Sequence, residues 1–390
     1  MDIDEIFMRG VNEIIDEKSL KERMAKGKLR IKYGVYPTKP DIHLGHAVVL
    51  WKLKKLQDMG HIIIFLIGDY TTKIGDPSGR NSTRPVLSDE EIKTNAKTYL
   101  DQVGNILDIT KTEIRYNSEW FNKMNFSEIL QLAGKFTVAQ IIERDDFAKR
   151  LKEGSDISLH EILYPLMQAQ DSVELKADVE IGGSDQKFNI LAGRDLQKKV
   201  GQTPQEVIFV DLLVGTDGNI KMSKSVGNYI SITDLPNEMF GKIMSIPDEL
   251  IIPYFELCTL LSNNEIGEIK EQLNKGENPR SIKAELAKAI IALYYSEKEA
   301  QDASNEFDRV FKNKEMPRDI RTKKIANMRL DDLLVNLEMA ASKSDARRLV
   351  EQGAVYLDDE KQNDPYKEII ISKEITIKAG PRNVMKVLPQ

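Results

Sequence analysis

The sequence predicts a doubly wound α/β core, and three consecutive segments lead to that prediction. Residues 29–37, LRIKYGVYP, have the pattern of a strand that ends in a proline turn. Residues 43–59 follow, with apolar positions such as Leu53 and Leu56 that suit a helix packed on a sheet. Residues 61–70, HIIIFLIGDY, are a continuous apolar run, typical of a strand buried on both faces of a parallel sheet. Together they form a βαβ unit, whose crossover is right-handed.

The composition is that of a globular chain with several domains. Its 390 residues suggest about two or three domains, and 41% hydrophobic with 30% charged residues argues against disorder. The longest apolar runs, such as residues 62–68, are too short to span a bilayer, and residues 1–20 read as an acidic amphipathic helix rather than a signal peptide. The single cysteine, Cys258, excludes an internal disulfide and a thiolate metal cluster. We therefore expect a soluble cytoplasmic protein with no membrane partner.

The net charge of −6 is unevenly distributed. Residues 316–390 hold 14 Lys or Arg and 12 Asp or Glu, a net of +2, which leaves −8 on the rest of the chain. A mildly basic tail on an acidic body is compatible with phosphate contacts, although a small surplus is also common on ordinary solvated surfaces.

The rest of the chain divides into helical stretches and a small terminal module. A polar Gly- and Pro-rich loop follows the buried strand, where parallel sheets bind their ligands. We expect helices at 88–104, 126–150, 159–175 and throughout 240–311, strands within 177–189 and 206–215, a charged linker at 316–328, and a last module of two short helices and alternating strands from 329 to 388.

Two of the four histidines, His43 and His46, lie one turn apart at the start of a predicted helix. A helix N-terminus presents free backbone N–H groups and a partial positive charge, and Gly45 allows a ligand to approach closely, so the pair suits a phosphate chain. A metal site would need a third ligand, and neither remaining histidine is near in sequence. A capping histidine beside a core histidine is the ordinary alternative.

A second motif, KMSKS at residues 221–225, places Lys221 and Lys224 on a glycine-flanked loop. Two ammonium groups with hydroxyls between them can clamp a polyphosphate and stabilise a departing pyrophosphate. On its own, a loop of this composition is more often a solvated basic loop.

HLGH in a first βα turn together with a later KMSKS resembles the signature pair of class I aminoacyl-tRNA synthetases. Further stretches resemble bacterial tyrosyl-tRNA synthetases of the KMSKS-loop branch: IGDPSGR, RYNSEW, ERDDFAKR, LHEILYPLMQAQDSVELKADVEIGGSDQKFN and DLLVGTDGNIKMSKSVGNYI. Residues 330–359 resemble the S4-type RNA-binding module of these enzymes, so the resemblance covers nearly the whole chain.

The resemblance implies a role for each matching position. Thr38, His43 and His46 would contact the triphosphate, and Lys221 and Lys224 would close over the leaving pyrophosphate. Asp185 and the backbone at Gly183 would hold the ribose and adenosine, and the wider ATP site would also include Gly34, Gly45, Met222, Ser223 and Lys224. Asp171 would accept a hydrogen bond from the substrate phenol, while Tyr164, Gln168 and Asp76 would surround its α-amino group, Gln186 would lie near its carboxylate and Asn117 would lie behind the pocket.

Each of these residues also has an ordinary structural explanation. Asp76 in GDPSG could be a turn aspartate, Gln168 and Asp171 could belong to a solvated helix face, and Tyr164 could be a core aromatic. Two positions depart from the family pattern. Tyr36 stands where the family usually has aspartate, and Gln170 stands where it usually has tyrosine, so we expect both to line the pocket and to bear on substrate choice.

The resemblance also implies the domains and partners. A Rossmann-type catalytic domain would span 1–230 with a helical insertion around 120–160, followed by a helical anticodon-recognition domain at 231–315 and an S4-like α+β domain at 329–390. Lys343, Ser344, Arg347 and Arg348 would meet tRNA phosphates, unless they form an ordinary basic helix face. The implied reaction joins L-tyrosine to tRNA-Tyr with ATP, in a homodimer, with Mg²⁺ carried by the substrate and no dedicated protein metal site. Three rivals remain: a tryptophanyl-tRNA synthetase, a paralogue that passes an acyl group to another amine, and a non-catalytic RNA-binding relative.

Overall fold

The computed structural model describes residues 9–36, 41–73, 87–312, 321–380 and 383–390. The chain forms two compact units, Met1–Ala300 and Gln301–Gln390, and each is described by itself. In the part of the chain that the structure describes, no helix is long and apolar enough to cross a membrane.

The first unit is built on a six-stranded sheet with the strand order β1-β6-β5-β2-β3-β4. The strands are β1 (Val11–Ile15), β2 (Arg30–Val35), β3 (Ile62–Ile67), β4 (Thr112–Tyr116), β5 (Val179–Gly183) and β6 (Glu206–Val210). All neighbours pair in parallel except β1, which is antiparallel to β6 at the edge. The doubly wound α/β prediction is therefore confirmed for this unit.

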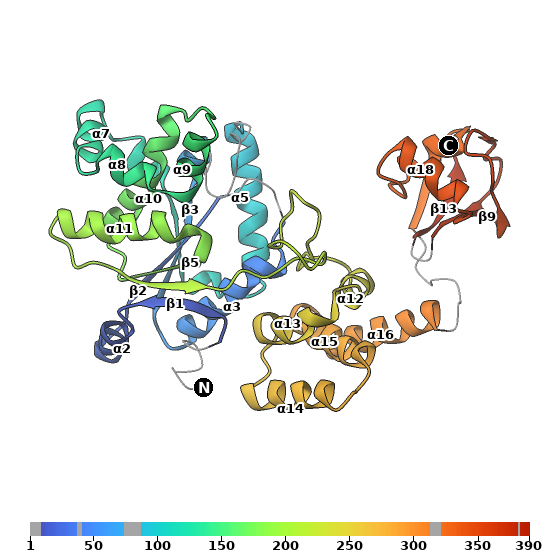
Figure 1. Cartoon of the computed structure of the whole chain (residues 1–390), viewed down its shortest axis with the longest axis horizontal. Helices are drawn as coiled ribbons and strands as arrows, with labels where there is room; N and C mark the ends of the chain where they lie inside the picture. Colours follow the sequence, from blue (N-terminus) through green and yellow to red (C-terminus); the bar gives the residue numbers. More distant parts are fainter. Residues whose placement is uncertain (1–8, 37–40, 74–86, 313–320, 381–382) are drawn as a thin grey trace. The chain divides into compact units, whose positions relative to one another are not determined.

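Helices cover both faces of this sheet (Figure 1). Helix α3 (Leu44–Asp58) connects β2 to β3, and α11 (Lys187–Lys199) connects β5 to β6. These two crossovers run in opposite directions along the sheet, so right-handed connections place their helices on opposite faces. The direction changes between β2 and β5, and the crevice outside the carboxyl ends of these two strands is where such a sheet binds ligands.

Two predicted helices near the sheet differ from the structure. Residues 126–150 form three short helices, α7 (Phe126–Ala133), α8 (Val138–Ile142) and α9 (Asp145–Lys152), because separate capping boxes begin α7 and α8. The predicted N-terminal helix is replaced by β1 and by α2 (Glu17–Lys26). Pairing with β6 outweighs helix propensity at Val11–Ile15, which becomes the edge strand of the sheet. The helices α5 (Asp89–Val103) and α10 (Leu159–Leu175) match their predicted positions.

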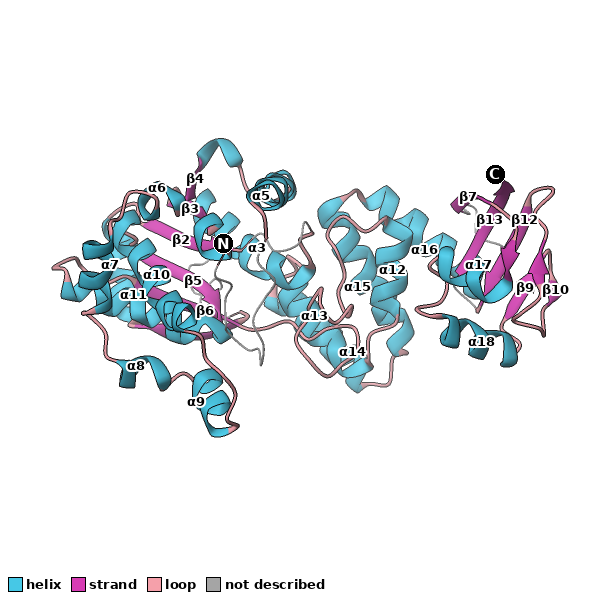
Figure 2. Ribbon diagram, turned by 90° about the horizontal axis from the view of Figure 1, so that it is seen from above, coloured by secondary structure: helices cyan, strands magenta, loops and turns pink. Residues whose placement is uncertain are grey.

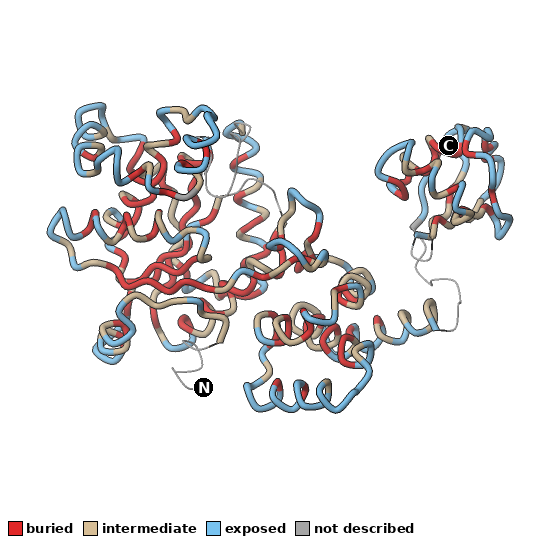
Figure 3. The backbone as a smooth tube through the Cα atoms, viewed as in Figure 1, coloured by how far each residue is buried: buried red, intermediate tan, exposed pale blue. Residues whose placement is uncertain are grey.

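Buried residues concentrate along the central strands and the helix faces turned to them (Figure 3). Strand β6 is buried at every position, as expected for a strand covered on both faces. By contrast, α7, α8 and α9 each carry large apolar side chains that are exposed.

A helical segment follows the sheet, as the pattern at 240–311 predicted. Its members are α12 (Pro236–Met244), α13 (Ile251–Cys258), α14 (Asn263–Asn274), α15 (Pro279–Tyr294) and α16 (Glu297–Phe311). Helices α12, α13 and α14 pack around α15 (Figure 2). Trp51 on α3 donates to the Tyr294 hydroxyl, and Tyr254 donates to the Val214 carbonyl, so the segment is joined to the sheet region. The predicted boundary at 230 falls inside this compact unit.

The second unit begins within α16, at Gln301, and contains a five-stranded sheet with the order β10-β9-β12-β13-β7 together with the helices α17 (Leu330–Asn336) and α18 (Lys343–Glu351). Its strands are β7 (Arg321–Ile325), β9 (Val355–Leu357), β10 (Glu360–Lys361), β12 (Ile375–Ala379) and β13 (Asn383–Pro389), and the short β8 (Met328–Arg329) pairs with β11 (Glu368–Ile369).

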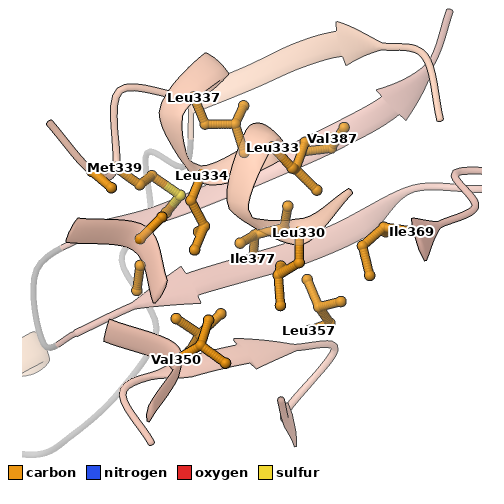
Figure 4. Close-up of a cluster of buried hydrophobic side chains, with 14 of the residues drawn as sticks. Leu330, Leu333, Leu334, Leu337, Met339, Val350, Leu357, Ile369, Ile377 and Val387 are labelled. Carbon is orange, nitrogen blue, oxygen red and sulfur yellow. The ribbon is translucent and has the colours of Figure 1, made fainter. Parts of the chain in front are cut away.

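Leucines of α17 pack against Val350, Ile377 and Val387 in the core of this unit (Figure 4). The predicted linker at 316–328 is wrong in part, because β7 pairs in parallel with β13 and belongs to this sheet.

Candidate functional site

A cavity of about 730 Å³ opens at the carboxyl ends of β2 and β5, at the point where the strand order changes direction. It is lined by the ends of both strands, the first turn of α3, one face of α10, Tyr99 of α5 and the loop at 220–226. Most of the predicted site residues that the structure describes therefore meet in one place. Thr38 and Asp76 lie outside the described residues, so their predicted roles stay predictions.

His43 is the N-cap residue of α3, and its ring stacks on that of His46 with centroids 3.8 Å apart. The backbone N–H of His43 donates to Nδ1 of His46 at 3.3 Å. Gly45 leaves room between them, because a Cβ at that position would lie 3.1 Å from the His43 imidazole and would press on this ring. The two rings thus form one pair at the helix N-terminus, as the spacing predicted.

Both imidazoles are neutral in this setting. Burial, followed by the charge of Lys224, lowers the pKa of His43 to about 3. Burial, followed by the neighbouring His43 and then Lys224, lowers the pKa of His46 well below its ordinary value of 6.5. Because Nδ1 of His46 accepts a hydrogen bond, the neutral ring carries its proton on Nε2. Nδ1 of His43 is buried without a hydrogen-bond partner among the described residues. Neutral rings can donate to phosphate oxygens without adding charge.

The lysine loop lies on the other side of the same cavity. Lys221 pairs with Asp185 at 2.6 Å, and Lys224 Nζ lies 3.2 Å from the Tyr99 hydroxyl. Asn228 shapes the loop by accepting from the Ser223 backbone at 2.8 Å, and the Met222 side chain is buried beneath it. The two lysines therefore flank the region in front of the histidine pair.

At the opposite end of the cavity, Asp171 presents a carboxylate that is only 2% exposed. Trp120 Nε1 donates to one of its oxygens at 3.0 Å, and Asn117 Nδ2 lies 3.5 Å from the other. Burial is the main cause that raises the Asp171 pKa to about 7, while Lys32 acts in the opposite direction. Asn117 also bonds Thr71 and Tyr70, so it lies behind the pocket as predicted.

A buried ionic network supports this end of the cavity. Lys32 Nζ lies 3.0 Å from Glu180 Oε1 and 2.8 Å from Ser172 Oγ, and it also donates to the Gln168 carbonyl. Gln205 donates to Glu180 at 2.5 Å. A buried ion pair of this kind needs its extra hydrogen bonds to offset desolvation, and here they fix the part of α10 that carries Gln168 and Ser172.

Tyr36 and Gln168 form the side wall next to Asp171, and Tyr164, which does not itself line the cavity, packs behind Tyr36. The Tyr36 hydroxyl donates to Gln168 Oε1 at 3.3 Å, and its ring centroid lies 5.6 Å from that of Tyr164. A Cβ on Gly68 would lie 2.8 Å from the Tyr36 ring, so this ring packs directly on the Gly68 backbone. The prediction that Gln170 lines the pocket is wrong. Its amide donates to Glu174 along an exposed part of α10, because it lies one residue out of phase with the buried face.

The glycines of the site leave room for ligand. A Cβ on Gly34 would meet open space, and this space belongs to the cavity. A Cβ on Gly183 would lie 2.6 Å from Asp185 Oδ1 and 2.9 Å from Leu212 Cδ2, so a larger residue there would displace these two side chains. Gln186 lines the cavity and accepts from Asn189 at 3.0 Å.

In the second unit, the predicted tRNA-binding side chains have acidic partners. Lys343 pairs with Asp332, Arg348 with Asp345, and Arg347 with the fully buried Asp331. Arg347 also lies 4.9 Å from the ring of Tyr366. These contacts hold the cations on an exposed face of α18, while their role toward RNA stays a prediction.

Sequence patterns did not reveal Lys32, Glu180, Trp120, Tyr99 and Asn228 as parts of this site. Lys32 and Glu180 did carry a usable signal, because one basic and one acidic residue stand in strands that were expected to be buried. Tyr99 and Trp120 carried none, since each reaches the site only through tertiary packing.

The chain matches the family described as tRNA synthetases class I (W and Y) over residues 24–312 and the S4 domain over residues 328–369. It is 50% identical to the tyrosine–tRNA ligase of Carboxydothermus hydrogenoformans, covering 98% of this chain and 97% of that protein. The tyrosine–tRNA ligase of Thermotoga maritima is 48% identical, over 98% of this chain and 96% of that protein.

Solved structures show the same fold. The crystal structure of tyrosyl-tRNA synthetase complexed with L-tyrosine from Archaeoglobus fulgidus has a TM-score of 0.62 and 25% identity, over 78% of this chain and 100% of that one. With the family match over residues 24–312, the chain belongs to the class I tRNA synthetases of the tryptophan and tyrosine family.

Proposed function

We propose that this cavity performs both steps of tyrosine–tRNA ligation, with the amino acid at the Asp171 end and ATP at the end formed by the histidine pair and the lysine loop. The activity of the chain is ATP-dependent tyrosine–tRNA ligation, because curated tyrosine–tRNA ligases match it over nearly its whole length. One observation supports the residue assignment above others. A buried carboxylate, two neutral imidazoles and two lysines all line a single cavity.

In the first step, a carboxylate oxygen of tyrosine attacks the α-phosphorus of ATP. A new P–O bond forms, the bond between the α-phosphorus and the bridging oxygen breaks, and pyrophosphate leaves. His43 and His46 donate hydrogen bonds to phosphate oxygens, and Lys221 and Lys224 supply positive charge at the leaving group. Positioning and charge stabilisation supply the rate, since the step needs no protein nucleophile.

Asp185 has to change partners during this step. Its carboxylate pairs with Lys221 at 2.6 Å. When ATP enters, Lys221 turns to the phosphates and the Asp185 carboxylate accepts from the ribose hydroxyls. Gly34 and Gly183 leave the space in which the nucleoside lies. Mg²⁺ accompanies the triphosphate and adds positive charge there; among the described residues, no group of three or more His, Cys, Asp or Glu is placed to hold a metal ion.

In the second step, a hydroxyl of the terminal tRNA ribose attacks the carbonyl carbon of tyrosyl-adenylate, and AMP leaves. The S4 domain contributes phosphate contacts through Lys343, Arg347 and Arg348, and the helical segment 231–315 reads the anticodon. These assignments rest on the family of the two matched regions and on the exposed cations of α18.

Asp171 selects tyrosine within a family that also contains tryptophan enzymes. Its carboxylate accepts from the substrate phenol, so phenylalanine would leave a buried polar group unpaired, a discrimination for which tyrosyl-tRNA synthetases are the standard example. Trp120 and Asn117 hold the carboxylate in place. The histidine pair and the lysine loop in the same cavity speak against a non-catalytic relative, and charging of tRNA distinguishes a paralogue with another acyl acceptor.

The enzyme acts as a cytoplasmic homodimer in this proposal. Five large apolar side chains stay exposed between α7 and the start of α10, which suits contact with a second copy: Phe126, Leu130, Val138, Leu151 and Leu159. The single cysteine is buried, and burial raises the pKa of its thiol, in keeping with a reducing compartment.

Pyrophosphate exchange with a panel of amino acids, followed by charging of tRNA-Tyr, tests the function. We expect exchange with tyrosine, little with phenylalanine or tryptophan, and transfer to tRNA. Absence of exchange with tyrosine would refute the function. Exchange without charging would instead favour the paralogue that uses another amine.

A further inference from the structure

Tyr99 of α5 contacts both the histidine pair and the lysine loop at the phosphate end of the cavity. Its ring lies in a T-shaped contact with His46, with centroids 6.2 Å apart. On the same side chain, Lys224 Nζ lies 4.9 Å from the ring centroid and 3.2 Å from the hydroxyl. Tyr99 is itself 5% exposed, so these contacts lie in a largely dry environment where a cation over a ring is worth most.

The helix that carries Tyr99 is fixed relative to the histidine pair. Gln102, one turn further along α5, accepts from the Ile42 backbone at 2.6 Å, and Ile42 directly precedes His43. The capping box of Ser88 and Glu91 secures the start of the helix. Tyr99 therefore has a fixed position beside His46, on a helix that is separate from the lysine loop.

The two lysines of the loop are held in different ways. Lys221 is paired with the carboxylate of Asp185, which neutralises its charge and has to be exchanged for phosphate. Lys224 lies on the aromatic face and the hydroxyl of Tyr99, a side chain that stays in place when ATP enters. The loop segment that bears an ammonium held in this way loses less freedom when ATP binds.

We propose that Tyr99 is a positioning residue that holds the Lys224 ammonium beside His46 before the triphosphate arrives, so that the clamp on the leaving pyrophosphate is preorganised. The inference rests on the proposed function, since it assigns Lys224 to that clamp. It predicts that Tyr99 acts through Lys224 on the rate of adenylate formation and leaves tyrosine binding unchanged.

The test measures the single-turnover rate of tyrosyl-adenylate formation at saturating ATP and tyrosine, together with the KM for tyrosine. Tyr99→Leu should lower the rate roughly tenfold, the size of one partly desolvated cation–π contact, while Tyr99→Phe retains the ring and loses only roughly threefold. Tyr295→Phe is the matched control. It removes a tyrosine hydroxyl that donates to the Asp234 carbonyl away from the cavity, and it should leave the rate unchanged.

The double variant with Lys224→Met separates positioning from a general structural role. If Tyr99 acts through Lys224, Tyr99→Leu should have no further effect once the ammonium is gone. A full loss on top of Lys224→Met, or a rise in the KM for tyrosine, would overturn the inference. If Tyr99→Leu is poorly folded by thermal melting, Tyr99→Phe carries the same comparison. A wild-type chain that forms no adenylate with tyrosine would fail the proposed function, whereas an unchanged rate in Tyr99→Leu, with Lys224→Met still impaired, would fail only this inference.

Discussion

At the scale of single residues, Asp171 is buried, yet its proposed role of accepting a hydrogen bond from the substrate phenol favours an ionised carboxylate. Its pKa is raised from 3.8 to about 7 by burial, so the carboxyl is mainly protonated at pH 6 and mainly ionised at pH 8. Because the folded protein binds this proton more tightly than the unfolded chain does, the free energy of unfolding contributed by the group falls as pH rises from about 4 to about 7.

The same shift predicts pH-dependent tyrosine binding. A phenol donates best to the ionised carboxylate, so the Kd for tyrosine should fall about tenfold between pH 6 and pH 8, as the ionised fraction of a group of pKa about 7 rises. Titration calorimetry at several pH values measures this. Asp171→Asn should bind tyrosine more weakly and without that slope, and an equal slope in both proteins would contradict the assignment.

Tyr36 is the pocket residue that we expect to depart from the family pattern. Its hydroxyl occupies Gln168 Oε1, an oxygen that we assign to the α-ammonium group of the substrate. Tyr36→Asp removes this competitor and adds a negative charge, so the KM for tyrosine should fall roughly threefold, as for a weak, partly exposed ion pair. Tyr36→Phe separates the two effects, because it only releases the oxygen. An unchanged or higher KM in Tyr36→Asp would mean that the pocket has adapted to the ring.

Sequence could predict those site residues whose chemistry lies in a local pattern. The histidine pair and the lysine loop each sit in a few consecutive positions with glycine beside them, and a helix N-terminus or a mobile loop gives such patterns a physical meaning. Trp120 and Tyr99 have no such pattern. Trp120 donates to Asp171 only because α6 (Ser118–Phe121) packs beside α10, and Tyr99 contacts Lys224 only because α5 packs beside the lysine loop.

At the scale of elements, the close approach of α10 and α11 controls the pocket. Gly193 of α11 lies against α10, and a Cβ there would be 2.8 Å from Ser172 Oγ and 3.0 Å from Gln205 Nε2. Both side chains belong to the network of Lys32 and Glu180. The orientation of α10, and with it Gln168 and Asp171, thus depends on a residue without a side chain.

Gly193→Ala should destabilise the protein by about 1–3 kcal/mol through overpacking and should raise the KM for tyrosine more than the KM for ATP. Urea unfolding and steady-state kinetics measure the two effects. Gly267→Ala, in α14 with open space around the added methyl, is the matched control and should be neutral or stabilise by up to about 1 kcal/mol. Equal changes in the free energy of unfolding and in the KM for tyrosine in the two variants would contradict this role of Gly193.

Helices and strands could be predicted from the sequence where one local signal dominated. The buried strand β3 and the capped helix α5 agree with their patterns. The helix expected at 126–150 is divided, because local capping signals at Asn125 and Thr137 begin new helices within one apolar period. Strand β1 could not be predicted, since its only reason to be extended is the exposed edge of β6.

At the scale of the whole molecule, the exposed apolar side chains between α7 and α10 give the dimer proposal a direct test. Leu159 is 75% exposed at the first position of α10, where an acidic residue suits the helix dipole. Leu159→Glu should therefore fold normally and shift the protein from dimer to monomer in analytical ultracentrifugation. Leu260→Glu, at an exposed position beyond α13, is the control and should stay dimeric. Persistence of the dimer in Leu159→Glu would place the interface elsewhere.

The central claim is that one cavity separates substrate recognition at Asp171 from transition-state stabilisation at Lys224. Single-turnover formation of tyrosyl-adenylate, measured against tyrosine concentration in Asp171→Asn and in Lys224→Ala, tests it most directly. We expect Asp171→Asn mainly to raise the tyrosine concentration needed for half-maximal rate, and Lys224→Ala mainly to lower the maximal rate. Equal loss of both parameters in the two variants would contradict it.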